Sequence, residues 1–225
     1  MDRSLLARLS AIPFRKPQLG RDYWILERAL VNGDEIVERI HGRDDWLLGL
    51  PHRQETWPGM RVANALLAAE MDVVEAWVRK QTGAKRLWQE QAPDGAQLDH
   101  NVAQLVGARE SGPRPHTDSR ALCRWAAVLY LTPKPDARAG TSFYRLRLPG
   151  GRLGGNVCPA PHANLREAFG VQGLPLEAWH EELVVENVFN RLLLYRADLI
   201  HSASRYFGGA APRSRRMTAV FFWMA

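Results

Sequence analysis

From about Lys85 onward, the sequence is a series of short apolar segments separated by turn residues, and this pattern restricts the chain to a few β architectures. Pro, Gly and Asp or Asn separate the segments, as in "ESGPRP", "TPKPDARAG" and "LPGGRLGGN". Six to eight short strands of this kind predict a double-stranded β-helix, the jelly-roll or cupin-like arrangement of two sheets. The candidate strands are "RLWQE", "NVAQLVGA", "HTD", "RWAAVLYL", "TSFYRLRL", "LVVENVF", "RLLLYRA" and "RMTAVFFWM".

The first part of the chain, residues 1–84, has a helical pattern instead. Apolar residues recur at helical spacing over 61–82, Gly83 supplies a stop, and a shorter helix is expected over 33–40. The intervening "DDWLLGLPHRQETWPGM" indicates an ordered loop, and one helical insert is expected near 164–169. We therefore expect a single, mostly β domain over 1–225, in which N-terminal helices (1–84) pack on one sheet of a jelly-roll core (85–225).

Composition favours a cytoplasmic protein with no membrane segment. The 225 residues include 46% hydrophobic and 24% charged side chains, which are ordinary values for a globular protein. No apolar run approaches the length that spans a bilayer, and the N-terminus lacks the pattern of a secretion signal. Two cysteines, Cys123 and Cys158, are too few for a disulfide scaffold or a cysteine-based zinc site.

The formal net charge is +6, which attracts anions that range from a small carboxylate to a phosphate backbone. The arginines are scattered, apart from "PRSRR" at 212–216, so a solvated basic surface is favoured over a nucleic-acid footprint.

A His and an Asp are one residue apart in "RPHTDSR", at the start of an apolar strand. Residues i and i+2 of an extended strand point to the same face, so His116 and Asp118 would direct an imidazole and a carboxylate to one point. This spacing is common by chance, and a polar turn explains it equally well.

His201 adds specificity, because it follows the apolar strand of "NRLLLYRADLIH", where a histidine is an unusual choice. Two histidines and one carboxylate form the facial triad of non-haem Fe(II) enzymes, which leaves coordination positions open for a co-substrate and oxygen. Zinc uses the same ligand set, so the residues indicate the site more securely than they indicate the metal.

The last segment, "RRMTAVFFWMA", places Arg216 and Thr218 on one face of an expected strand. Burying an arginine in an apolar core costs free energy unless an anion pairs with it. A guanidinium binds a carboxylate through two hydrogen bonds. Tyr130 is a candidate for a further hydrogen bond to that carboxylate. Arg213 and Arg215 are the rival assignments, because a slip of one residue exchanges the faces.

Taken in the order in which they occur along the chain, the motifs resemble those of the Fe(II)/2-oxoglutarate-dependent dioxygenases, and the prolyl-hydroxylase-like branch in particular. The resemblance rests on "HTD", "VLYL" at 128–131, "AGTSFYR" at 139–145, "NRLLLYRADLIH" and "RMTAVFFW", and it spans about residues 102–223. One departure is the long segment "SASRYFGGAAPRSR" after His201, which adds Arg205 as an outside candidate for the anion site.

The resemblance implies that His116, Asp118 and His201 bind Fe(II), and that Arg216 binds the 2-oxoglutarate carboxylate with help from Tyr130 and Thr218. It implies O2 as the other co-substrate and hydroxylation as the outcome, because related halogenases replace the carboxylate ligand with a small residue.

The substrate is indicated less clearly, and we expect a small amino-acid-like or peptide molecule. Arg53, Trp57 and Arg61 lie in a candidate lid at 50–61, and Arg145 is a further candidate contact. The alternatives are a nucleic-acid dealkylase of the same superfamily and a non-catalytic jelly-roll binding protein. The sequence leaves the oligomeric state open.

Overall fold

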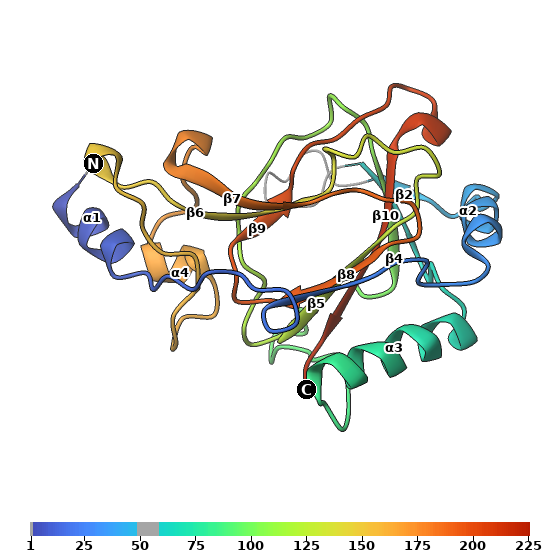
Figure 1. Cartoon of the computed structure of the whole chain (residues 1–225), viewed down its shortest axis with the longest axis horizontal. Coiled ribbons are helices and arrows are strands. Elements are labelled where there is room, and N and C mark those ends of the chain that lie inside the picture. Colours follow the sequence, from blue (N-terminus) through green and yellow to red (C-terminus); the bar gives the residue numbers. More distant parts are fainter. Residues whose placement is uncertain (1, 49–58) are drawn as a thin grey trace.

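The computed structural model describes residues 2–48 and 59–225, and within them the chain is mostly β (Figure 1). Two sheets form, and all their strand pairs are antiparallel. The larger sheet has the order β1-β8-β5-β10-β4-β3-β2 and the smaller one the order β7-β6-β9. The strands are β1 (Tyr23–Leu26), β2 (Leu47–Leu48), β3 (Met60–Ala63), β4 (Val102–Val106), β5 (Trp125–Tyr130), β6 (Thr141–Leu146), β7 (Trp179–Val185), β8 (Leu192–Arg196), β9 (His201–Ala203) and β10 (Arg216–Trp223).

The two sheets face each other across an apolar layer. The ring of Phe143 on β6 lies 5.6 Å from the ring of Tyr23 on β1 and 5.7 Å from that of Tyr195 on β8, measured between centroids. Because side chains alternate along a strand, β5 directs Ala126, Val128 and Tyr130 into this layer and its other side chains to the opposite face. The layer is the interior in which buried polar groups on β5, β8 and β10 can meet.

Helices cover the outer faces of both sheets. The helices α2 (Gly33–His41) and α3 (Ala68–Thr82) pack on the outer face of the larger sheet, and α3 ends at Gly83 in the left-handed conformation, as predicted. The helices α1 (Arg3–Ser10) and α4 (Leu165–Phe169) lie at the opposite end of the molecule, against the smaller sheet (Figure 1). Three short 3-10 turns complete the elements: η1 (Pro149–Gly151), η2 (Leu176–Ala178) and η3 (Pro212–Ser214).

Two expectations for residues 1–84 were wrong. This part is not purely helical, because β1, β2 and β3 all join the larger sheet, and the helix expected from residue 61 begins only at Ala68. Val62 fits the helical spacing but lies on β3, which gains its backbone hydrogen bonds by pairing with β4. The helices also cover both sheets and not one. The helical insert near 164–169 is confirmed as α4.

In residues 2–48 and 59–225, no helix combines the length and apolar character needed to cross a bilayer. Cys123 and Cys158 are buried free thiols.

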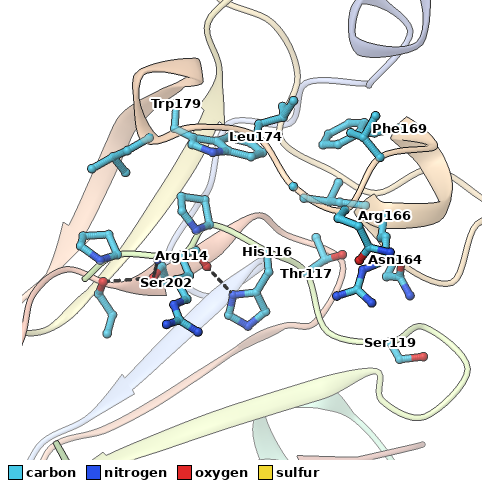
Figure 2. A pocket seen from close by; sticks show the side chains of 18 of the residues that line it. Arg114, His116, Thr117, Ser119, Asn164, Arg166, Phe169, Leu174, Trp179 and Ser202 are labelled. Carbon is cyan, nitrogen blue, oxygen red and sulfur yellow. Dashed lines mark hydrogen bonds between the residues drawn. The ribbon is translucent and has the colours of Figure 1, made fainter. Parts of the chain in front are cut away.

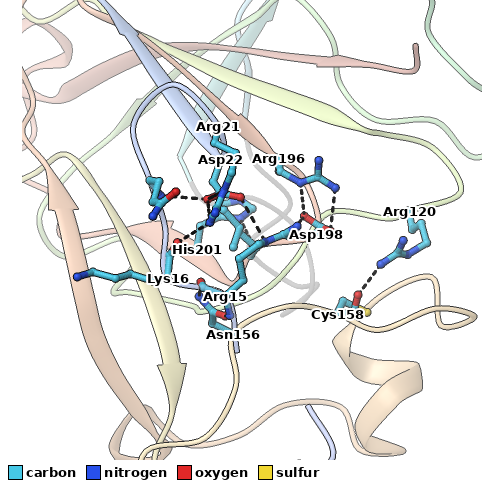
Figure 3. A network of polar contacts seen from close by, with 12 residues as sticks. Arg15, Lys16, Arg21, Asp22, Arg120, Asn156, Cys158, Arg196, Asp198 and His201 are labelled. Carbon is cyan, nitrogen blue, oxygen red and sulfur yellow. Dashed lines mark hydrogen bonds and ion pairs between the residues drawn. The ribbon is translucent and has the colours of Figure 1, made fainter. Parts of the chain in front are cut away.

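An ion-pair network ties the N-terminal segment to the turn that precedes β9 (Figure 3). Asp22 is only 1% exposed, and its Oδ2 accepts hydrogen bonds from the Arg21 guanidinium and the Gln18 backbone N–H. Arg15 lies 3.3 Å from Asp22 Oδ1 through its Nε and 2.9 Å from Asp198 Oδ1 through its Nη2. The turn held in this way carries His201 three residues further on.

Asp22→Ala is therefore expected to lower the free energy of unfolding by about 2–3 kcal/mol, because it leaves buried donors without their charged acceptor. Arg21→Ala is the control: the Arg21 side chain is 52% exposed, and an exposed pair contributes less than about 1 kcal/mol. Urea unfolding followed by circular dichroism measures both variants, and equal losses would contradict a special role for the buried carboxylate.

Candidate metal centre

Three polar side chains converge where the segment before β5 crosses β9. His116 and His201 exchange backbone hydrogen bonds of 3.0 and 2.9 Å, and the Asp118 N–H donates to the Ala197 carbonyl. His116 Nε2 lies 3.8 Å from Asp118 Oδ1, and His201 Nε2 lies 3.6 Å from Asp118 Oδ2. One candidate ligand atom from each residue lies within 4.8 Å of the others. The structure thus brings the three predicted ligands together.

Backbone carbonyls orient both imidazole rings. His116 Nδ1 lies 2.8 Å from the Arg114 carbonyl oxygen, and His201 Nδ1 lies 2.9 Å from the Leu199 carbonyl oxygen. A carbonyl only accepts hydrogen bonds, so each Nδ1 carries the ring proton and each Nε2 presents a lone pair towards Asp118. Metal-binding histidines are oriented in the same way in known sites.

Burial sets the charge of the three ligands. It raises the pKa of Asp118 to about 6 and lowers that of His201 to about 4, and burial together with the nearby His201 lowers the pKa of His116 to about 4. Near neutral pH the site therefore holds two neutral imidazoles and one carboxylate, the protonation states that a metal requires. Asp118 Oδ2 is buried and accepts no hydrogen bond from any residue in the described ranges. The N2O donor set and this oxygen fit a divalent transition metal.

Metal affinity is expected to depend on pH with a definite sign. Below about pH 6 Asp118 takes up a proton that competes with the metal, so the apparent affinity should fall by about tenfold for each pH unit. Below about pH 4 the two histidines add to the loss and steepen it. Titration with Co(II), followed by visible absorption, measures the profile. An affinity that stays constant from neutral to weakly acidic pH would contradict this assignment of ligands.

Arg216 places a buried cation on the inner face of β10. It is 4% exposed, and its Nε and Nη2 donate to the carbonyl oxygens of Ala139 and Gly140 at 2.7 and 3.2 Å. The rings of Tyr130 and Tyr206 each have their centroid 5.7 Å from the guanidinium carbon. No carboxylate pairs with Arg216 anywhere in residues 2–48 and 59–225. A buried guanidinium without a counter-ion is costly, and an anion would offset that cost.

The strand register explains which groups flank this cation. Thr218 on β10 lies opposite Tyr130 on β5, so both side chains project from the same face as Arg216. The Tyr130 hydroxyl lies 2.8 Å from Thr141 Oγ1, and Thr218 Oγ1 lies 3.5 Å from Arg216 Nη1. Gly140 is required for close packing, because a Cβ there would lie 1.8 Å from the Val185 carbonyl oxygen.

The rival arginines lie elsewhere. Arg213 forms an exposed pair with Glu38, Arg215 lies 2.9 Å from Glu110, and Arg205 is exposed. Burial therefore separates Arg216 from the three alternatives.

Two further tyrosines near the site, buried Tyr195 and half-buried Tyr206, were not singled out from the sequence. Tyr206 contacts Arg216, and the ring of Tyr195 lies 4.5 Å from the ring of His201 between centroids. Burial raises the pKa of both phenols, which keeps them neutral. Tyr195 offered a signal, since it is the polar member of the otherwise apolar run "LLLY" at 192–195. Tyr206 lies in the long segment after His201, where no periodicity points inward.

A cavity of about 720 Å³ opens onto the His116 side of the metal centre (Figure 2). One wall is formed by residues 113–117 and Ser119, and the opposite wall by α4 with the chain that follows it to the start of β7. Arg216 does not line this cavity, but Tyr206, whose ring lies next to the Arg216 guanidinium, does.

The predicted substrate residues do not gather in this cavity. Arg53 and Trp57 lie outside the described residues, as does most of the candidate lid. Arg61, on β3, pairs with Asp99 at 2.5 Å. The structure places Arg145 away from the cavity, because its guanidinium stacks on Phe14 at 3.7 Å and bonds the Gly154 carbonyl.

The family comparison covers most of the chain. Residues 20–222 match the family described as "Family of unknown function (DUF6445)". The chain belongs to this family. No curated protein matched the DUF6445 chain by sequence.

Solved structures show which fold the DUF6445 chain has. The non-haem α-ketoglutarate-dependent epimerase SnoN from nogalamycin biosynthesis is 18% identical, with a TM-score of 0.53 over 99% of this chain and 82% of SnoN. HygX from Streptomyces hygroscopicus, with nickel and 2-oxoglutarate bound, is 13% identical, with a TM-score of 0.47 over 98% of this chain and 85% of HygX. A Pseudomonas putida prolyl-4-hydroxylase is 14% identical, with a TM-score of 0.45 over 98% of both chains. The likeness to SnoN shows that the DUF6445 chain shares the fold of this epimerase.

Proposed function

We propose that the DUF6445 chain is a non-haem Fe(II)/2-oxoglutarate-dependent dioxygenase that hydroxylates a small amino-acid-like or peptide substrate. We take its two sheets to be the double-stranded β-helix of such enzymes. One observation carries the proposal: a His-Asp-His cluster and an uncompensated buried arginine occupy the same interior between the sheets.

Different residues would bind the metal and the co-substrate. His116, Asp118 and His201 would hold Fe(II), and three protein ligands leave positions for other ligands. Arg216 would bind the distal carboxylate of 2-oxoglutarate, and Tyr130 and Thr218 flank the same point. The buried guanidinium also needs this anion for its own charge balance.

The bound metal, 2-oxoglutarate and O2 together supply oxidative decarboxylation to succinate and CO2, with the second oxygen atom entering a C–H bond of the substrate. The chain's own residues prepare the site for this chemistry. The Arg114 and Leu199 carbonyls keep the two imidazoles in the ligating tautomer, and burial of Asp118 excludes water from the carboxylate. The buried ring of Tyr195 lies next to His201, and the buried ring of Tyr130 lies next to Arg216.

A spectroscopic experiment tests the co-substrate directly. Anaerobic addition of 2-oxoglutarate to the Fe(II)-loaded protein is expected to give a weak visible charge-transfer band. If a fully metallated sample shows no band, 2-oxoglutarate is not the co-substrate.

The outcome of the reaction needs a separate experiment, because SnoN is an epimerase. Incubation with amino acids and peptides should give succinate together with a product heavier by one oxygen atom, both detected by mass spectrometry. A product of unchanged mass with inverted configuration would replace hydroxylation by epimerisation. Methylated oligonucleotides in the same assay test the dealkylase alternative.

A further inference from the structure

We propose that the cavity beside His116 is the substrate site and that it selects a carboxylate-bearing small molecule with an apolar, ring-containing body. This inference rests on the proposed function, because it assigns the second organic molecule of that reaction. Every residue used in the argument is described.

The position of the cavity connects it to the metal centre. His116, a predicted ligand, lines the cavity together with its neighbours Arg114 and Thr117 (Figure 2). Ser202, next to the ligand His201, lines it as well. A molecule in the cavity would therefore contact one predicted ligand residue, His116, and the sequence neighbour of a second, His201. Because Arg216 is absent from the lining, such a molecule would not compete with the co-substrate for its anion site.

The charge of the cavity favours an anion. Its lining includes two arginines, Arg114 and Arg166, and contains no Asp or Glu among the described residues. Arg166 forms no ion pair with any described residue, and its guanidinium extends from α4 towards Thr117 (Figure 2). A carboxylate suits the planar, forked guanidinium better than a neutral group does.

The opposite wall favours an apolar ring. Phe169 and Trp179, whose ring centroids lie 6.3 Å apart, form this wall with Leu174 (Figure 2). Trp179 is 6% exposed, and its Nε1 is buried without a hydrogen-bond partner among the described residues. The part of Trp179 that lines the cavity therefore adds apolar ring surface to this wall.

The volume of the cavity sets the size of the substrate. About 720 Å³ falls within the range of roughly 300–1,000 Å³ that is typical of sites for drug-sized ligands. A free aliphatic amino acid would leave most of this space unfilled. An aromatic or acylated amino acid, or a short peptide with a free carboxylate, fits the combination of size, charge and apolar wall.

Binding of matched probes tests the selectivity without requiring catalysis. A panel of aromatic and N-acylated amino acids is compared with the corresponding primary amides by calorimetry on the metal-free protein. The carboxylates are expected to bind about tenfold more tightly than their amides. Arg166→Gln should remove this preference and leave amide binding unchanged, whereas Leu174→Ala should weaken acids and amides equally. Arg152→Gln, an exposed arginine outside the cavity, is the charge-matched control.

Two outcomes overturn the proposal: acids that bind no better than amides, including a panel in which nothing binds, and a preference that survives Arg166→Gln.

A second measurement tests the position of the site. With Mn(II) bound, the proton resonances of a bound acid should broaden, and Asp118→Ala should abolish the broadening. Unbroadened resonances of an acid bound to the Mn(II)-loaded protein would contradict the location beside the metal. Failure of metal binding alone would refute the proposed function and leave the calorimetric result intact.

Discussion

Asp118→Ala is expected to eliminate metal-dependent stabilisation while leaving the metal-free protein at least as stable as the wild type. The physical reason lies in the burial of this carboxylate. Without metal, burial raises its pKa to about 6, and no described residue donates a hydrogen bond to its Oδ2. A buried charge without such partners destabilises the fold. Removing it is therefore not expected to lower the free energy of unfolding of the metal-free protein. The same oxygen becomes favourable only when a cation lies next to it.

Thermal unfolding with and without Ni(II) measures this prediction. A metal present at a hundred times its dissociation constant stabilises the wild-type protein by about 2.7 kcal/mol. The variant is expected to bind at least about a hundredfold more weakly, since even residues that only orient ligands contribute 10- to 100-fold. At the same Ni(II) concentration its stabilisation should fall below about 0.5 kcal/mol.

Asp136→Ala is the matched control, because Asp136 is a half-buried carboxylate whose partner is the exposed Arg138. It should retain the full Ni(II) shift. An Asp118→Ala protein that Ni(II) still stabilises would show that the cluster is not the metal site. A variant that loses stability in the absence of metal would assign Asp118 a structural role.

The sequence pattern predicted the parts of this site that lie on long strands. β5, β8 and β10 are largely apolar runs. A histidine, tyrosine or arginine within or next to such a run is unusual, and the sequence therefore indicated these residues as candidates. The i, i+2 spacing also brings the side chains of His116 and Asp118 to one point in the structure, because the segment is extended where it bridges to β9.

The parts that the sequence did not predict depend on tertiary contacts. β1 and β3 have four residues each, and such short segments show no clear alternation; the larger sheet supplies the hydrogen bonds that make them strands. Likewise, Trp179 and Arg166 are unremarkable in sequence. They line one cavity only because the insert between β6 and β7 folds α4 back towards His116. Arg145 stacks on Phe14 and does not line this cavity, a contact that the sequence pattern does not reveal.

Arg216→Met is expected to abolish measurable 2-oxoglutarate binding while preserving the metal site. Truncating one member of a buried, hydrogen-bonded charge pair typically costs about 2–5 kcal/mol, so the dissociation constant should rise by at least about 30-fold. Arg216→Lys keeps the charge but loses the fork that bonds the Ala139 and Gly140 carbonyls, and we expect an intermediate loss of about tenfold. Calorimetric titration of the Ni(II)-loaded protein with 2-oxoglutarate measures both variants.

Arg215→Met is the control for this experiment. Arg215 is the adjacent residue, but its guanidinium pairs with Glu110 and lies outside the layer between the sheets. It should bind 2-oxoglutarate as the wild type does, and all three variants should keep the Ni(II)-induced thermal shift. If Arg216→Met destabilises the fold by leaving the two carbonyls unpaired, Arg216→Lys still tests the charge. Wild-type affinity in Arg216→Lys and Arg216→Met together would place the co-substrate elsewhere, and the uncompensated guanidinium would then require a different anion.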